Sequence, residues 1–76
     1  MKLDKLFADA TGIAQAESGR AKQRAVTDMF LADGHDIRLA TVKKWWERSS
    51  IPTPWLMRLC KSAAQRGTVI DLSQYT

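Results

Sequence analysis

Hydrogen-bond donors are concentrated in a short segment near the middle of the chain, residues 38–48. Four of its side chains could read base edges: Arg38, Thr41, Lys43 and Lys44. Arginine and lysine can donate to O6 and N7 of guanine, while threonine can donate to a base or pack its methyl group on thymine. Arg48 comes later in the segment and is better suited to a backbone phosphate. The pattern predicts a surface that contacts double-stranded DNA.

A second basic group precedes this segment, in the run Arg20-Ala21-Lys22-Gln23-Arg24. If a helix begins there, its first backbone N–H groups are free, and three cations stand beside them. Free amides and cations together are suited to a phosphate group. We therefore expect Arg20, Lys22 and Arg24 to contact the DNA backbone.

Residues that could support catalysis are scarce. One cysteine, Cys60, and one histidine, His35, are too few for an internal disulfide or a Cys/His metal site. The chain has no glycine-rich phosphate loop and no nucleophile elbow. We expect no enzymatic activity, no cofactor and no small-molecule substrate. Cys60 is expected to be an inert packing residue, and His35 a turn residue.

The composition is that of a small, basic, globular protein. The 76 residues carry a formal net charge of +4, and 45 % of them are hydrophobic, which is too apolar for a disordered chain. Residues 38–66 hold seven basic residues and one acidic residue, so a polyanion is the expected partner of this part. No apolar run is long enough for a membrane span, and the charged N-terminus does not resemble a secretion signal. We expect one domain, residues 1–76, in the cytoplasm.

Apolar residues recur at helical spacing through most of the chain, which predicts an all-α fold, a compact bundle of about four helices. The first helix has one apolar stripe: Leu3, Leu6, Phe7 and Ala10. Gly12 is placed to end this helix. Residues 13–19 are expected to connect it to the next one.

Three further helices follow from capping signals and apolar periodicity. The second runs from about residue 19 or 20 to 33, with Ser18 as its N-cap and Gly34 as its stop. The third covers roughly residues 39–48. The fourth begins with Thr53 as N-cap and a proline in the first helical position, and Gly67 ends it.

The tail, residues 68–76, is short, rich in β-branched residues and half alternating. This pattern predicts a short strand or an extended arm. Because such a small domain has little core for the tail to join, we expect its apolar side chains to form a dimer interface. These candidates are Val69, Ile70, Leu72 and Tyr75.

The segment from Leu31 to Pro52 has the spacing of a helix-turn-helix centred on Val42. Ile37 falls at the buried position of the turn, and Trp45 at the second core position of the recognition helix. Ala32, with Leu31 beside it, would supply the small residue where the two helices cross. The glycine usual in the turn is Asp36 here, which predicts a slightly extended turn through residues 34–36.

The run Thr41-Val42-Lys43-Lys44-Trp45-Trp46-Glu47-Arg48, then Ser50-Ile51-Pro52 and an apolar helix from Trp55, carries a family resemblance. Over about residues 20–66 the chain resembles the small lambda-repressor-like and Cro-like regulators of phages and other mobile elements. The resemblance implies a compact helical domain that binds operator DNA as a dimer and represses its own promoter.

The resulting interpretation is a sequence-specific, dimeric transcriptional regulator that binds an inverted-repeat operator through the major groove. Two alternatives stay open. One is a helix-turn-helix-like module that binds a protein, as an anti-activator or antitoxin partner does. The other is a nucleic-acid binder that uses charge alone and has no sequence preference.

Overall fold

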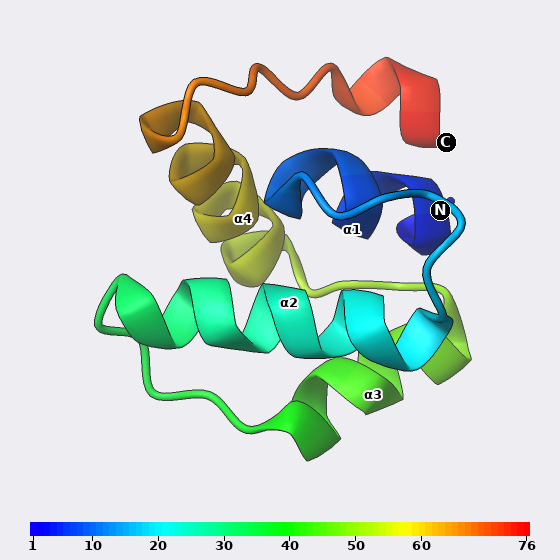
Figure 1. Cartoon of the computed structure of the whole chain (residues 1–76), viewed down its shortest axis with the longest axis vertical. Coiled ribbons are helices and arrows are strands. Elements are labelled where there is room, and N and C mark those ends of the chain that lie inside the picture. The colour runs from blue at the N-terminus through cyan, green and yellow to red at the C-terminus, as the bar shows by residue number, and fades with distance from the viewer.

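Helices account for all of the regular structure in the computed structural model, which describes residues 1–76. Their bounds are α1 Leu3–Thr11, α2 Gly19–Ala32, α3 Leu39–Arg48, α4 Thr53–Gln65 and a 3₁₀ helix, η1, Leu72–Tyr75. The prediction of an all-α bundle is confirmed. The domain measures 26 × 24 × 23 Å. In the view of Figure 1, α2 runs across the molecule with α3 below it and α1, α4 and η1 above it. None of the helices is long and apolar enough to cross a membrane.

Local signals at the helix ends explain most of these bounds. The Ser18 hydroxyl accepts a hydrogen bond from the Ala21 N–H at 3.1 Å, so the expected N-cap of α2 is confirmed. Gly12 ends α1 in the left-handed conformation, with a φ of 77°. The expected N-cap of α4 was wrong by one residue. Pro52 occupies that position, and Thr53 is the first helical residue and makes no capping hydrogen bond.

The core is built around α1, which packs against α2, α4 and η1. All four residues of its predicted apolar stripe are buried. Residues from the other helices complete a single hydrophobic cluster. The largest of these residues are Phe30, Trp45, Leu59 and Tyr75. One continuous cluster is consistent with the expected single domain.

Residues 33–38 connect α2 to α3. Gly34 has a φ of 83°, which favours glycine, and Ile37 is buried beneath the connection, so the extended turn is confirmed. Val42 and Trp45 are buried as predicted. The assignment of Ala32 and Leu31 to the helix crossing was wrong, because both are exposed, Leu31 by 50 %.

The small residue at the contact between α2 and α3 is Gly19 instead. A Cβ atom on Gly19 would lie 2.8 Å from the Trp46 indole, so only glycine leaves room for that ring. One close approach of the two helices is therefore at the first turn of α2, and a second contact is that of Trp45 with Phe30 near the end of α2.

The tail is neither a strand nor a free arm. It turns back along α1, where the Lys2 N–H donates to the Tyr75 carbonyl at 2.6 Å. The Tyr75 side chain is only 3 % exposed, and its hydroxyl donates to Asp9 at 2.6 Å. Ile70 packs on the core and Leu72 is half-buried, whereas Val69 is 91 % exposed. The tail is thus part of the monomer, and the expectation that Tyr75 faces a second subunit was wrong.

Candidate nucleic-acid interface

One side of α3 is exposed to solvent. Val42 and Trp45 lie on the same side of α3 because of their helical spacing. Both are buried, so this side faces the bundle. The opposite side is exposed throughout, and with the preceding Arg38 we call it the basic face. Its members are Arg38, Ala40, Thr41, Lys43, Lys44, Glu47 and Arg48.

The charges of the basic face have no partners within the molecule. Four ion pairs occur in the structure, and none includes a residue of α3 or Arg38. The pairing between Lys43 and Glu47 that the i, i+4 spacing would permit does not form. Four cations against one carboxylate therefore give this face a positive potential that is available to a polyanion.

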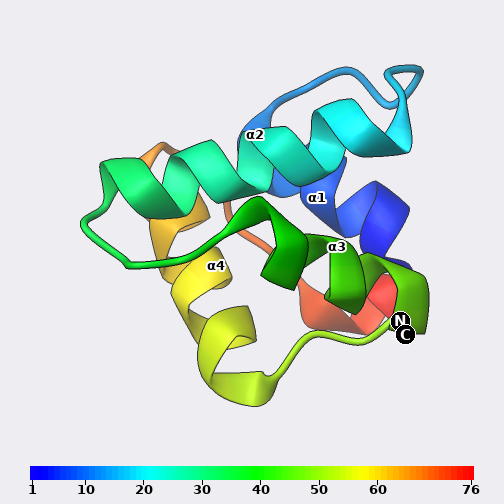
Figure 2. The ribbon, with the colours of Figure 1, turned by 90° about the horizontal axis from the view of Figure 1, so that it is seen from below.

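A groove joins the basic face to the start of α2. It has a volume of about 410 Å³ and is lined by Arg20, Gln23, Leu39 and Lys43. Arg20, expected to contact a phosphate, and Lys43, expected to contact a base, thus lie on the same surface. α3 lies beside the N-terminal half of α2, drawn in cyan, in both views of the ribbon (Figures 1 and 2). A ligand on α3 would therefore also meet the first turn of α2.

Lys22 and Arg24, the other two residues expected to contact phosphates from α2, both form ion pairs within the molecule. Lys22 is only 2 % exposed, and its ammonium donates to Asp4 at 2.5 Å and to the Gln15 carbonyl at 2.6 Å. It ties α2 to α1 and cannot reach DNA, so its assignment as a phosphate contact was wrong. Arg24 is exposed but donates to Asp28, one turn later, at 3.2 Å.

A sequence signal for the burial of Lys22 did exist. Lys22 precedes Val26 by four residues and Met29 by seven, which places Lys22 on the apolar stripe of α2. A lysine in such a stripe needs a buried acceptor. Asp4, eighteen residues earlier, could not be identified as that acceptor before the packing of α1 on α2 was known.

Aromatic packing fixes the position of α3 against the bundle. The Trp45 ring centroid lies 5.6 Å from that of Trp55 and 6.5 Å, edge-on, from that of Phe30. Trp46 lies 5.7 Å from Phe7. His35 lies in the connection between α2 and α3, as expected of a turn residue, and it packs edge-on against Phe30 and Trp55. Rigid rings on one side of α3 keep the other side in a defined orientation.

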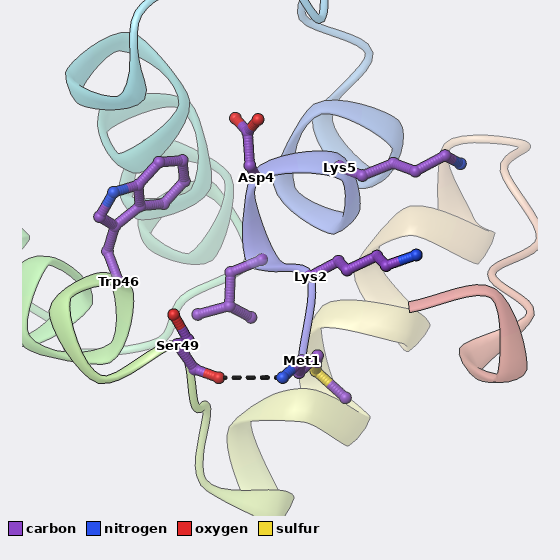
Figure 3. A pocket seen from close by; sticks show the side chains of 7 residues that line it. Met1, Lys2, Asp4, Lys5, Trp46 and Ser49 are labelled. Carbon is purple, nitrogen blue, oxygen red and sulfur yellow. Dashed lines mark hydrogen bonds between the residues drawn. The ribbon is translucent and has the colours of Figure 1, made fainter. Parts of the chain in front are cut away.

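A second hollow, of about 410 Å³, lies near the chain start and the last turn of α3, between Met1 and Trp46. Figure 3 shows that Lys2 and Lys5 extend away from Trp46 rather than toward it. Asp4 is engaged by Lys22, and the Met1 ammonium donates to the Ser49 carbonyl at 3.3 Å. Its charged groups do not converge on a common point, so we assign no ligand to this hollow.

No group of three or more His, Cys, Asp or Glu side chains lies close enough to hold a metal ion. Cys60 is half-buried on α4, and burial raises the pKa of its thiol. A protonated thiol is a poor nucleophile, in keeping with the packing role expected for Cys60. No protein-family model, curated protein or solved structure matches the chain.

Proposed function

We propose that this chain is a sequence-specific DNA-binding transcriptional regulator in which α2 and α3 act as a helix-turn-helix. The observation that carries the proposal is the basic face of α3, whose residues are all exposed and have no internal ion pair. Structural ion pairs would neutralise such charges within the molecule. Unpaired cations on a rigidly seated helix are instead available to the phosphates and base edges of DNA.

The dimensions of α3 support insertion into the major groove. Ten residues give a helix of about 15 Å, and a groove about 12 Å wide admits one helix. In this arrangement Arg38, Thr41 and Lys44 reach base edges, with Lys43 beside them. Arg48 in the last turn of α3 contacts a phosphate.

The start of α2 supplies the second set of backbone contacts. Arg20 is exposed at the groove that α2 shares with α3. The free N–H groups of the first turn of α2 add a partial positive charge next to it. Arg24 reaches a phosphate by exchanging its exposed pairing with Asp28, which costs little at a solvent-exposed site.

Two copies of the chain on an inverted repeat complete the proposal. One recognition helix contacts only a few base pairs, and two-fold symmetry doubles the contact set. The resemblance to lambda-repressor-like and Cro-like regulators supports the same assembly, as well as repression of the chain's own promoter in the bacterial cytoplasm. Val69 and the exposed part of Leu72 are the tail positions left to form the dimer interface.

The test is selection of binding sites from a random duplex pool, followed by fluorescence anisotropy on a selected and a scrambled duplex at two salt concentrations. We expect the selected duplex to bind about a thousandfold more tightly. Lys44→Ala should cost about 1–3 kcal/mol on the selected duplex only. Lys61→Ala removes the same charge from α4, outside the basic face, and should leave affinity unchanged.

Two other results would replace the proposal. Equal binding to both duplexes that collapses with salt would indicate a charge-driven binder without sequence preference. Failure to bind any duplex would favour the protein-binding module. Self-association is tested separately by sedimentation equilibrium, in which Val69→Glu should weaken the dimer without changing the helical content.

A further inference from the structure

A polar cavity lies at the far end of α2 from Arg20, between the α2–α3 connection and α4. Its volume is about 300 Å³, at the lower end of the range for small-molecule sites. Every residue that lines it is polar: Asp33, His35, Arg58, Lys61, Ser62 and Gln65. Walls without apolar side chains are suited to an ionic ligand and would leave an apolar one without contacts.

The charges around this cavity favour an anion. Arg66 donates to both carboxylate oxygens of Asp33, at 3.1 Å each, and the Ser62 hydroxyl donates to the same group. The hydrogen bond from Arg66, and after it that from Ser62, lowers the pKa of Asp33. The Asp33 carboxylate therefore stays ionised and bound to these two side chains. Arg58 and Lys61 take part in no ion pair. Two cations are therefore left to face the cavity without a counter-charge.

The Arg58 guanidinium lies over an aromatic ring. Its guanidinium carbon lies 4.6 Å from the centroid of the Trp55 ring. Trp55 packs edge-on against Phe30 at 5.0 Å and against His35 at 5.8 Å. A stacked guanidinium loses less conformational freedom when it forms a two-pronged hydrogen bond to an oxyanion.

We propose that this cavity binds a compact phosphate group, as inorganic phosphate or a small phosphomonoester. The Arg58 fork and the Lys61 ammonium hold its oxygens, and the Gln65 amide adds a neutral donor. A phosphomonoester carries about −1.5 to −2 charges at pH 7, which matches the two unpaired cations better than a carboxylate does.

The proposal does not depend on DNA binding. Arg20 and Asp33 lie thirteen residues apart along α2 and its cap, which separates the cavity from the α2–α3 groove by about 20 Å. The cavity wall includes His35, in the connection that leads into α3. A ligand there would contact the segment that positions α3 without occupying the basic face.

The experiment is a ¹H–¹⁵N NMR titration of the full chain with inorganic phosphate and with methyl phosphate, at ionic strength held constant with potassium chloride. We expect saturable shifts at the Trp55 indole and at the amides of His35 and Lys61. Arg58→Gln with Lys61→Gln should weaken binding at least about tenfold. The matched control, Lys43→Gln with Lys44→Gln, removes the same charge from α3 and should bind as the wild type does.

Three results would overturn the proposal. The first is the absence of saturable shifts at these three residues. The second is an equal loss in both double variants, which would indicate general attraction of anions to a basic protein. The third is a shift of the His35 and Trp55 NMR signals on addition of a scrambled duplex but not of free phosphate. That result would assign the cavity to the DNA backbone.

Discussion

Replacement of Tyr75 by phenylalanine tests how the tail is held. The ring is buried among core residues, and phenylalanine keeps that packing almost unchanged. What is lost is one hydrogen bond, from the Tyr75 hydroxyl to Asp9 at 2.6 Å. The variant therefore isolates a single contact between η1 and α1.

The magnitude follows from the kind of bond and its exposure. A hydrogen bond to a charged acceptor contributes about 1.5–3 kcal/mol. The Asp9 side chain is 39 % exposed and keeps Lys5 as a partner at 3.0 Å, so the lower half of that range applies. We expect Tyr75→Phe to lower the free energy of unfolding by about 1.5–2 kcal/mol. For a domain of this size the melting temperature should fall by about 10 °C.

The difference between wild type and Tyr75→Phe should depend on pH. The Tyr75 and Lys5 hydrogen bonds lower the pKa of Asp9 in the folded protein. The contribution of Asp9 to stability is therefore complete above about pH 4, its unfolded pKa, and is lost as the pH falls through its folded pKa. The Asp9 hydrogen bond and burial raise the pKa of Tyr75 to about 12. Its contribution is complete below about pH 10, the unfolded value, and is lost as the pH rises toward 12.

The assay is urea unfolding followed by far-ultraviolet circular dichroism at pH 3, 5, 7, 9 and 11. The stability difference should be largest and constant from pH 5 to 9 and smaller at both extremes. An unchanged urea midpoint for Tyr75→Phe at pH 7 would refute the reasoning. So would Tyr75→Ala melting like the wild type, because loss of a buried aromatic ring costs about 3–5 kcal/mol.

Four further substitutions test the packing of α3 and the buried lysine. Gly19→Ala should cost about 1–3 kcal/mol because its Cβ would meet the Trp46 indole, and thermal melts with no loss would contradict that contact. Trp45→Ala should cost about 3–5 kcal/mol and leave little folded protein by circular dichroism; a cooperative melt near the wild-type temperature would remove Trp45 from the core. Asp4→Ala should destabilise more than Lys22→Met in urea unfolding, because the first leaves a buried ammonium without its carboxylate and the second removes the charge. The opposite order would show that the pair itself supplies the stability.

The helices and most of the basic face could be predicted from the chain alone. Helical periodicity and capping residues are local, so the bounds of α3 and the cap at Ser18 followed from neighbouring residues. The same periodicity identified the solvent-facing side of α3, with Lys43, Lys44 and Arg48. The N-cap of α4 was one residue out, because a threonine next to two prolines offers two equivalent starting points.

Contacts between distant residues were decided only by the tertiary structure. The burial of Lys22 depends on Asp4, and that of Tyr75 on the surface of α1, so neither was visible in its own neighbourhood. The polar cavity likewise brings the α2–α3 connection onto α4. Short-range patterns determine which residues are helical and which side of each helix is apolar. The burial of a polar side chain, or its place in a shared site, depends on which helix covers it, and that is a property of the packed bundle.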